Sequence, residues 1–139
     1  MPPQNQPHLV VDVFAGPGGL GEGFLAPRAS RQTRFKSALS IEKDDSAHET
    51  LTLRHFLRAF PYDEFPEDYY DFLADKLTLD ELYAAHPAEH ASARASAKRI
   101  TLGPDSHVQV KRLLEERIGE HAKWALVGGP PCQAYSLVG

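Results

Sequence analysis

The stretch "LVVDVFAGPGGLGEGF", residues 9–24, decides the fold of this chain. Residues 9–14 form a short apolar run rich in β-branched side chains, which is typical of a buried parallel strand. The glycines that follow, Gly16, Gly18 and Gly21, have the G-x-G-x-x-G spacing that leads from a strand into a helix beside a nucleotide. This stretch therefore predicts a strand, a glycine-rich loop and a helix in direct succession.

The remainder of the chain alternates between strand and helix patterns in the same way. Strands are predicted at residues 37–42, 100–102 and 124–129, and helices at residues 45–60 and 107–121. Such alternation predicts an α/β fold, a Rossmann-like, doubly wound and mainly parallel sheet. Ligands of these sheets bind at the carboxyl ends of the strands. We therefore expect the loops after Phe14, Glu42 and Val127 to share one edge.

The middle of the chain is too long for a simple connection, since a βα connection usually takes about 2 to 6 residues. We predict a helical insertion over about residues 61–98, on the flank of the sheet. Within it, "TLDE" (Thr78 to Glu81) is a capping box that opens a helix, and the alanine-rich residues 88–99 have helical propensity. Its acidic residues at 63, 64, 67, 68 and 71 are expected to face no basic residue. Its aromatic residues are expected to pack the insertion down, or else to dock a partner: Phe60, Tyr62, Phe65, Tyr69, Tyr70 and Phe72.

Composition sets the class of protein. The 139 residues, 42% of them hydrophobic, fit one soluble domain. The net charge of −4 supplies no general attraction to nucleic acid or to an anionic membrane. A single cysteine excludes an internal disulfide, and no apolar run approaches the roughly 20 residues of a spanning helix. We therefore expect a cytoplasmic protein without a membrane partner.

The histidines do not predict a metal site. "HPAEH", residues 86–90, matches H-x-x-E-H, a zinc-protease pattern, but Pro87 makes His86 a helix flank and the sequence offers no third ligand. The other histidines lack ligand spacing and are expected to be solvated: His8, His48, His55, His107 and His121. No metal is expected.

Two carboxylates flank the glycine loop. Glu42 lies about 20 residues beyond it, at the end of the second predicted strand, where a carboxylate can accept hydrogen bonds from ribose hydroxyls. Asp12 lies inside the first strand, an unfavourable place for a charge unless a ligand or backbone amides compensate it. The pattern predicts a nucleoside cofactor, although an ordinary strand-to-helix turn with a solvated Glu42 fits the same residues.

The single cysteine, Cys132, lies in "GGPPCQAYS", residues 128–136. Pro130 and Pro131 restrict the backbone before it, and a turn that leads into a helix N-terminus lowers the pKa of a thiol. This setting favours a nucleophile at the sheet edge, beside the glycine loop. The alternative is a small buried cysteine that only packs.

Three segments together resemble a known family. "DVFAGPGGLGEGF" (residues 12–24), "SIEKDD" (residues 40–45) and "GGPPCQAYS" are similar, in order, to the first, second and fourth motifs of the cytosine-C5 DNA methyltransferases. The resemblance covers roughly residues 9–50 and 100–139. It implies the S-adenosylmethionine-dependent methyltransferase fold, with residues 1–139 forming part of the cofactor-binding domain.

The resemblance also implies roles for individual residues. S-adenosylmethionine would be held by the loop residues, with Glu42 on the ribose hydroxyls and Asp12 organising the loop. Lys43 and Asp105 would lie at the adenine. Pro104 and Ser106, on either side of Asp105, depart from the third motif of the family. Pro131 would shape the cleft, and Gln133 and Ser136 would lie near the nucleic-acid backbone. The loop residues concerned are Phe14, Ala15, Gly16, Gly18 and Gly19.

The activity implied is methyl transfer from S-adenosylmethionine to C5 of cytosine in DNA, for restriction-modification or for epigenetic marking by DNA methylation. A restriction-modification enzyme would be associated with the bacterial nucleoid. The Cys132 thiolate would add to C6 of a base that has left the duplex. The later motifs of the family would lie beyond Gly139, so we expect an N-terminal portion that is inactive alone. DNA would be contacted mostly by the missing C-terminal half, and the chain would self-associate or bind a complementing chain. Three alternatives stay open: a tRNA cytosine-C5 methyltransferase, an NAD-dependent oxidoreductase and a non-catalytic nucleoside-binding module.

Overall fold

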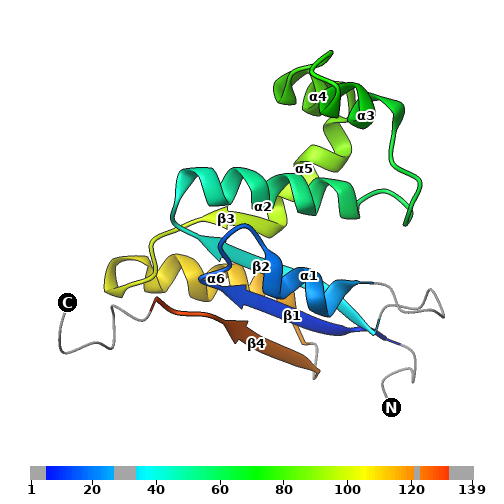
Figure 1. Cartoon of the computed structure of the whole chain (residues 1–139). Helices are drawn as coiled ribbons and strands as arrows, with labels where there is room; N and C mark the ends of the chain where they lie inside the picture. The colour runs from blue at the N-terminus through cyan, green and yellow to red at the C-terminus, as the bar shows by residue number, and fades with distance from the viewer. Residues whose placement is uncertain (1–5, 27–33, 121–122, 132–139) are drawn as a thin grey trace.

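The computed structural model describes residues 6–26, 34–120 and 123–131 (Figure 1). Its centre is a four-stranded sheet with the order β3-β2-β1-β4. All three strand pairs are parallel. The strands are β1 (His8–Val13), β2 (Phe35–Glu42), β3 (Ala97–Arg99) and β4 (Trp124–Gly128). The chain therefore has the predicted α/β fold, with the first strand at the point where the strand order reverses.

Helices cover both faces of the sheet, as a doubly wound fold requires. Helices α1 (Gly19–Leu25) and α2 (Asp45–Arg58) lie on the face that carries Asp12 and Ser40. Helix α6 (His107–Ile118) lies on the opposite face (Figure 1). The larger core lies under α6 and is formed by Leu9, Val11, Ala38, Leu39, Ile41, Ile100 and Ile118.

Three further helices lie between α2 and β3 in the chain (Figure 1). α3 (Glu67–Leu73) and α4 (Leu79–Ala85) lie farthest from the sheet, and α5 (Pro87–Ser96) packs on α2 and leads back to β3 (Figure 1). The capping box is confirmed, since the Thr78 hydroxyl accepts from the Glu81 N–H and the Glu81 carboxylate accepts from the Thr78 N–H. No helix among the described residues is long and apolar enough to cross a membrane.

Half of the six aromatic residues from Phe60 to Phe72 pack this region down, as predicted. Phe60, Tyr69 and Phe72 contact a second core around Phe56 and Leu82, whereas Tyr62 and Tyr70 are exposed. The prediction for the acidic residues was wrong at two positions. Asp71 lies 3.3 Å from the Lys76 ammonium, and Asp68 lies 3.0 Å from the His86 ring. These bases come from later turns of the same region, so a scan of the acidic stretch alone does not find them.

The strand predicted at residues 100–102 lies three residues earlier. β3 comprises Ala97–Arg99, which the alanine-rich pattern assigned to a helix, so the last two residues of the predicted insertion belong to the sheet. Ala97 pairs with Ser40 of β2 and is buried against Ala15 and Leu51, and this pairing overrides helical propensity. Helix α6 ends at Ile118 rather than at residue 121, because Gly119 turns the chain with a φ of 57°.

Candidate functional site

The loop after β1 forms a tight turn at the carboxyl edge of the sheet. Phe14 has a φ of 54°, in the left-handed region that a bulky side chain rarely adopts, and the residue is 42% exposed. The Ala15 N–H donates to the Ile41 carbonyl of β2, at 3.0 Å, and the Gly18 N–H donates to the Ala15 carbonyl, at 3.1 Å. The backbone of this loop is therefore fixed by hydrogen bonds, and the aromatic ring of Phe14 faces outward.

Gly18 is needed both for its conformation and for its close approach to α2. Its φ is 97°, and a Cβ atom there would lie 2.9 Å from the Leu51 Cδ1. Gly16 also has a positive φ, 57°, but a Cβ atom there would meet no atom within 4 Å. The space around Gly16 is therefore open to a ligand, whereas the space around Gly18 is filled by the protein. Gly19 begins α1 and is exposed.

Glu42 joins the glycine loop to the start of α2. Its Oε2 accepts from the Gly16 N–H at 2.7 Å, and its Oε1 accepts from the N–H groups of Lys43 and Asp44 at 2.7 and 2.8 Å. Burial acts to raise the pKa of Glu42, but the N–H groups of Asp44, Gly16 and Lys43 together lower it. The side chain is therefore a carboxylate at neutral pH. A carboxylate has about four acceptor positions, so Oε2 keeps room for one more donor.

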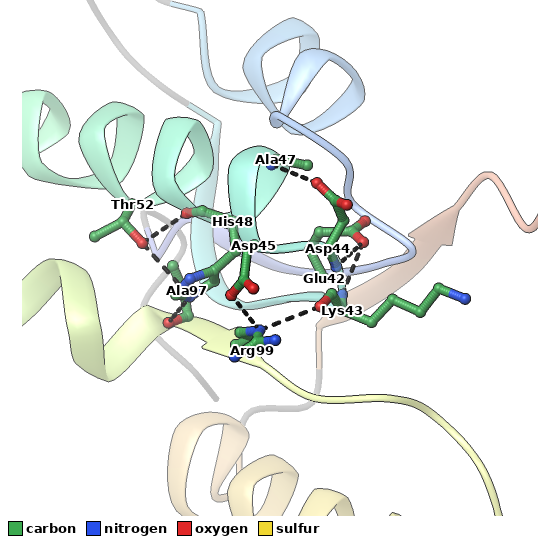
Figure 2. A network of polar contacts seen from close by, with 9 residues as sticks. All are labelled: Glu42, Lys43, Asp44, Asp45, Ala47, His48, Thr52, Ala97 and Arg99. Carbon is green, nitrogen blue, oxygen red and sulfur yellow. Dashed lines mark hydrogen bonds and ion pairs between the residues drawn. The ribbon is translucent and has the colours of Figure 1, made fainter.

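Figure 2 shows how this region is braced from β3. The Arg99 Nε lies 2.8 Å from the Asp45 Oδ1 and donates to the Lys43 carbonyl at 3.3 Å. Asp44 caps α2 by accepting from the Ala47 N–H. The Lys43 side chain points away from this network, and the residue is exposed. The spacing of residues along the sequence predicts none of the contacts of Arg99, because these contacts join residues more than fifty positions apart.

Asp12 is buried beneath the loop, with 2% of its surface exposed. Burial raises the pKa of its carboxyl, and the Gly21 N–H and the positive charge of Arg58 partly offset this effect. Neither carboxylate oxygen has full hydrogen-bond geometry with any described residue. A Cβ atom at position 21 would lie 3.0 Å from the Asp12 Oδ2, so Gly21 makes room for the carboxyl.

A second buried polar residue, His55, was predicted to be solvated, and that prediction was wrong. His55 is 6% exposed, and its Nε2 lies 3.0 Å from the Ser40 Oγ of β2. Ser40 pairs in register with Asp12, so a layer of polar side chains lies between the sheet and α2. Burial, followed by the charges of Arg58, Arg117 and His48, lowers the pKa of His55 to about 3. The neutral ring can thus remain in the core.

Asp105, the candidate for the adenine, lies in the loop after β3, within a short 3-10 turn (Pro104–Ser106). Its side chain is exposed. Ser106 closes the loop, because its hydroxyl donates to the Gly103 carbonyl and accepts from the Gly103 N–H, both at 3.1 Å. Asp105 therefore follows the carboxyl end of β3, but no described contact joins it to the glycine loop.

The end of β4 lies beside the end of β1. Gly128 pairs with Val13, and a Cβ atom at position 128 would overlap the Val13 carbonyl. Glycine therefore lets the two strands approach closely, which brings residues 129–131, including Pro131, to the edge that carries the glycine loop. The sequence shows a glycine at position 128, but only the packing of β4 against β1 explains why a larger residue would not fit there. Cys132, Gln133 and Ser136 lie outside the described residues.

The histidines of the H-x-x-E-H pattern have separate surroundings. His86 flanks α4 and α5 as predicted and contacts Asp68. The His90 ring stacks on Tyr83, with ring centroids 4.0 Å apart. Within residues 6–26, 34–120 and 123–131, no three metal-ligating side chains lie together.

Comparison with known proteins gives one informative relative. The chain is 32% identical over 161 residues to the Type II methyltransferase M.Bpa9945I of Bacillus paralicheniformis. The match covers 94% of this chain and 32% of the relative, so the chain spans about a third of that protein's length. No family model matches the chain, and no solved structure matches it. Over most of its length, the chain is therefore similar to a methyltransferase.

Proposed function

We propose that this chain is the cofactor-binding and nucleophile-bearing part of a DNA cytosine-C5 methyltransferase that uses S-adenosylmethionine. The observation that carries the proposal is the meeting of three elements at one sheet edge. They are the glycine loop after β1, Glu42 at the end of β2 and residues 129–131 after β4. The similarity to a Type II methyltransferase supports methyl transfer. The assignment of C5 of cytosine as the methylated atom and of DNA as the substrate rests on the resemblance of the motif around Cys132.

The residues at the edge fit an adenosyl sulfonium compound. Gly16 leaves open space for close approach, and the exposed ring of Phe14 offers an apolar surface beside it. The remaining acceptor position of the Glu42 carboxylate suits a ribose hydroxyl. Glu42 and Asp12 also contribute negative charge near a cationic ligand. Phe14, Gly16 and Glu42 would bind and orient the cofactor, with Asp12 buried beneath the loop that holds it; the cofactor supplies an electrophilic methyl group when bound.

Cys132 would provide the nucleophile of the reaction. Its thiolate would add to C6 of cytosine, and the electrons of the C5–C6 double bond would become available at C5. C5 would then take the methyl group, and the sulfur that carried it would leave as a neutral thioether. Loss of the C5 proton to solvent would restore the C5–C6 double bond and release the Cys132 thiolate. The base has to leave the duplex to reach such a site.

The first test is calorimetric titration of the chain with S-adenosylmethionine and, separately, with NAD. We expect binding of the sulfonium compound and not of NAD. Glu42→Gln should weaken that binding about tenfold or more, because a hydrogen bond to a charged group contributes about 1.5 to 3 kcal/mol. Glu64→Gln is the matched control, since Glu64 is exposed and lies far along the chain from the loop.

The outcomes separate the candidate functions. Binding of NAD alone would favour an oxidoreductase and refute the proposal. Equal weakening by Glu42→Gln and Glu64→Gln would show that the carboxylate does not face the ligand. Far-ultraviolet circular dichroism of each variant checks that the fold is retained.

A further inference from the structure

The Glu42 carboxylate uses its two oxygens unequally. Its Oε1 accepts from the N–H groups of both Lys43 and Asp44, at 2.7 and 2.8 Å. Within the described residues, its Oε2 accepts from the Gly16 N–H alone, at 2.7 Å. Because a carboxylate oxygen has about two acceptor positions, the remaining position lies on Oε2. The two N–H groups that follow Glu42 therefore decide which oxygen is left for a ligand.

The turn that carries these two N–H groups is not fixed by regular secondary structure. Lys43 and Asp44 belong to neither β2 nor α2. Asp44 is held from the helix side, because its carbonyl accepts from the His48 N–H at 2.9 Å and its carboxylate caps α2. Lys43 lies before this cap and takes no part in the helix. A separate contact is needed to keep its peptide groups in one orientation.

The end of β3 supplies that contact. The Ile100 N–H donates to the Glu42 carbonyl at 3.1 Å. The Arg99 Nε donates to the Lys43 carbonyl at 3.3 Å and lies 2.8 Å from the Asp45 Oδ1 (Figure 2). Two successive carbonyls are thus held from β3, the first by a backbone N–H and the second by a side chain.

Arg99 has this position to itself in the part of the chain that the structure describes. There, it is the one side chain from outside β2 and α2 that forms a hydrogen bond or ion pair with residues 43–45. Its neighbour Lys98 is in register with Ile41, which lies in the core under α6. Since successive side chains of a strand point to opposite faces, Lys98 cannot replace Arg99.

We propose that Arg99 is a positioning residue for the candidate site. It holds the turn of residues 43–45, whose N–H groups direct the Oε2 of Glu42 to the ligand. The same hold keeps the Lys43 side chain pointing away from the carboxylate (Figure 2). Arg99 acts through the backbone and does not touch the ligand. The inference deepens the proposed function, and its ligand rests on that proposal.

The pKa of Glu42 reports the geometry of this turn. Burial acts to raise this pKa, the N–H groups of Asp44, Gly16 and Lys43 lower it, and the negative charge of Asp44 raises it. The charge of Arg99 is not one of these causes, and the Asp45 carboxylate lies beside that charge. Removal of Arg99 should therefore change the pKa of Glu42 only if the N–H groups of the turn move.

The first test needs no ligand. Carbon-13 NMR titration measures the pKa of the Glu42 carboxyl in the free chain. We expect Arg99→Gln to raise this pKa toward its ordinary value, because the N–H groups of residues 43 and 44 are no longer held on Oε1. Lys98→Gln is the matched control, since it removes the same charge from the next position of β3, and it should leave the pKa unchanged.

The second test measures binding of S-adenosylmethionine by calorimetry. The Arg99 and Asp45 side chains are 55% and 79% exposed, so the expected effect is modest. Arg99→Gln should raise the dissociation constant about threefold to fivefold, and Lys98→Gln should leave it unchanged. In a chain that already carries Glu42→Ala, Arg99→Gln should have no further effect, because Arg99 acts through that carboxylate.

Each outcome decides the inference. An unchanged pKa of Glu42 in Arg99→Gln would overturn it, whether or not the chain binds S-adenosylmethionine. Equal effects of Arg99→Gln and Lys98→Gln would also overturn it, as would additive effects of Arg99→Gln and Glu42→Ala on binding. A raised pKa in a chain that binds no S-adenosylmethionine would support the positioning of Glu42 by Arg99 and refute the proposed function instead. Far-ultraviolet circular dichroism checks that each variant is folded.

Discussion

Acidification should destabilise this fold in part through His55, a histidine that is buried in the core. Its ring lies between β2 and α2, 6% exposed, with its Nε2 3.0 Å from the Ser40 Oγ. Burial, assisted by Arg58, Arg117 and His48, lowers its pKa from 6.5 to about 3. The folded chain therefore keeps this ring neutral at a pH where the unfolded chain protonates it.

The sign and size of the effect follow from linkage. Above pH 6.5 the ring is neutral in both states and makes no pH-dependent contribution. As the pH falls below 6.5, the unfolded state binds the proton first, and the free energy of unfolding decreases by about 1.4 kcal/mol per pH unit. The loss from His55 reaches about 2 kcal/mol at pH 5 and continues toward pH 3.

Urea unfolding at pH 7 and pH 5 measures this loss if variants remove the other titrating groups from the comparison. His55→Gln lacks the titrating ring, so the difference in unfolding free energy between the wild type and this variant should change by about 2 kcal/mol between the two pH values. His107→Gln, at an exposed position of α6, is the control that removes a different histidine. A constant difference for His55→Gln, within about 0.5 kcal/mol, would refute the assignment of a buried neutral ring.

Two further substitutions test the local structure. Gly18→Ala should lower the free energy of unfolding by about 2 to 3 kcal/mol, because of its φ of 97° and the overlap of a Cβ atom with Leu51. Gly23→Ala in α1, where a Cβ atom meets nothing within 4 Å, is the control and should be neutral or stabilising. Equal effects of the two substitutions in thermal unfolding would contradict this reasoning. Thr78→Ala should lower the free energy of unfolding by about 1 kcal/mol, because it removes the N-cap of α4. Thr101→Ala, in an exposed loop, is the control and should change stability little. A fully stable Thr78→Ala variant would show that the capping box is dispensable.

The sequence predicted the features that depend on residues close together in the chain. The strand, glycine loop and helix of residues 9–24 follow from apolar clustering and glycine spacing, and the cap of α4 follows from Thr78 and Glu81. For the candidate site, the sequence predicted that the glycine loop and Glu42 lie at the same edge of the sheet. The roles that the resemblance gives to its residues stay predictions, and Cys132 lies outside the described residues.

Errors occurred where a distant partner decides the outcome. Ala97 has helical propensity, but its backbone pairs with β2 and its side chain is buried against Leu51, so it lies in a strand. His55 lies in a helix that carries several polar residues, and only the packing of α2 on β2, where Ser40 contacts the ring, shows that His55 is buried. Neither partner lies within one helical turn of the residue.

The sequence by itself therefore determined the order of the elements, the tight loop after β1 and the placement of Glu42 at the end of β2, because spacing and steric limits act within a few residues. The tertiary structure alone decided where β3 pairs, why Gly128 has to be glycine, that His55 is buried and that Trp124 and Leu126 are exposed. Those properties arise from strand pairing and burial between segments far apart in the chain, whose free energy exceeds any local preference.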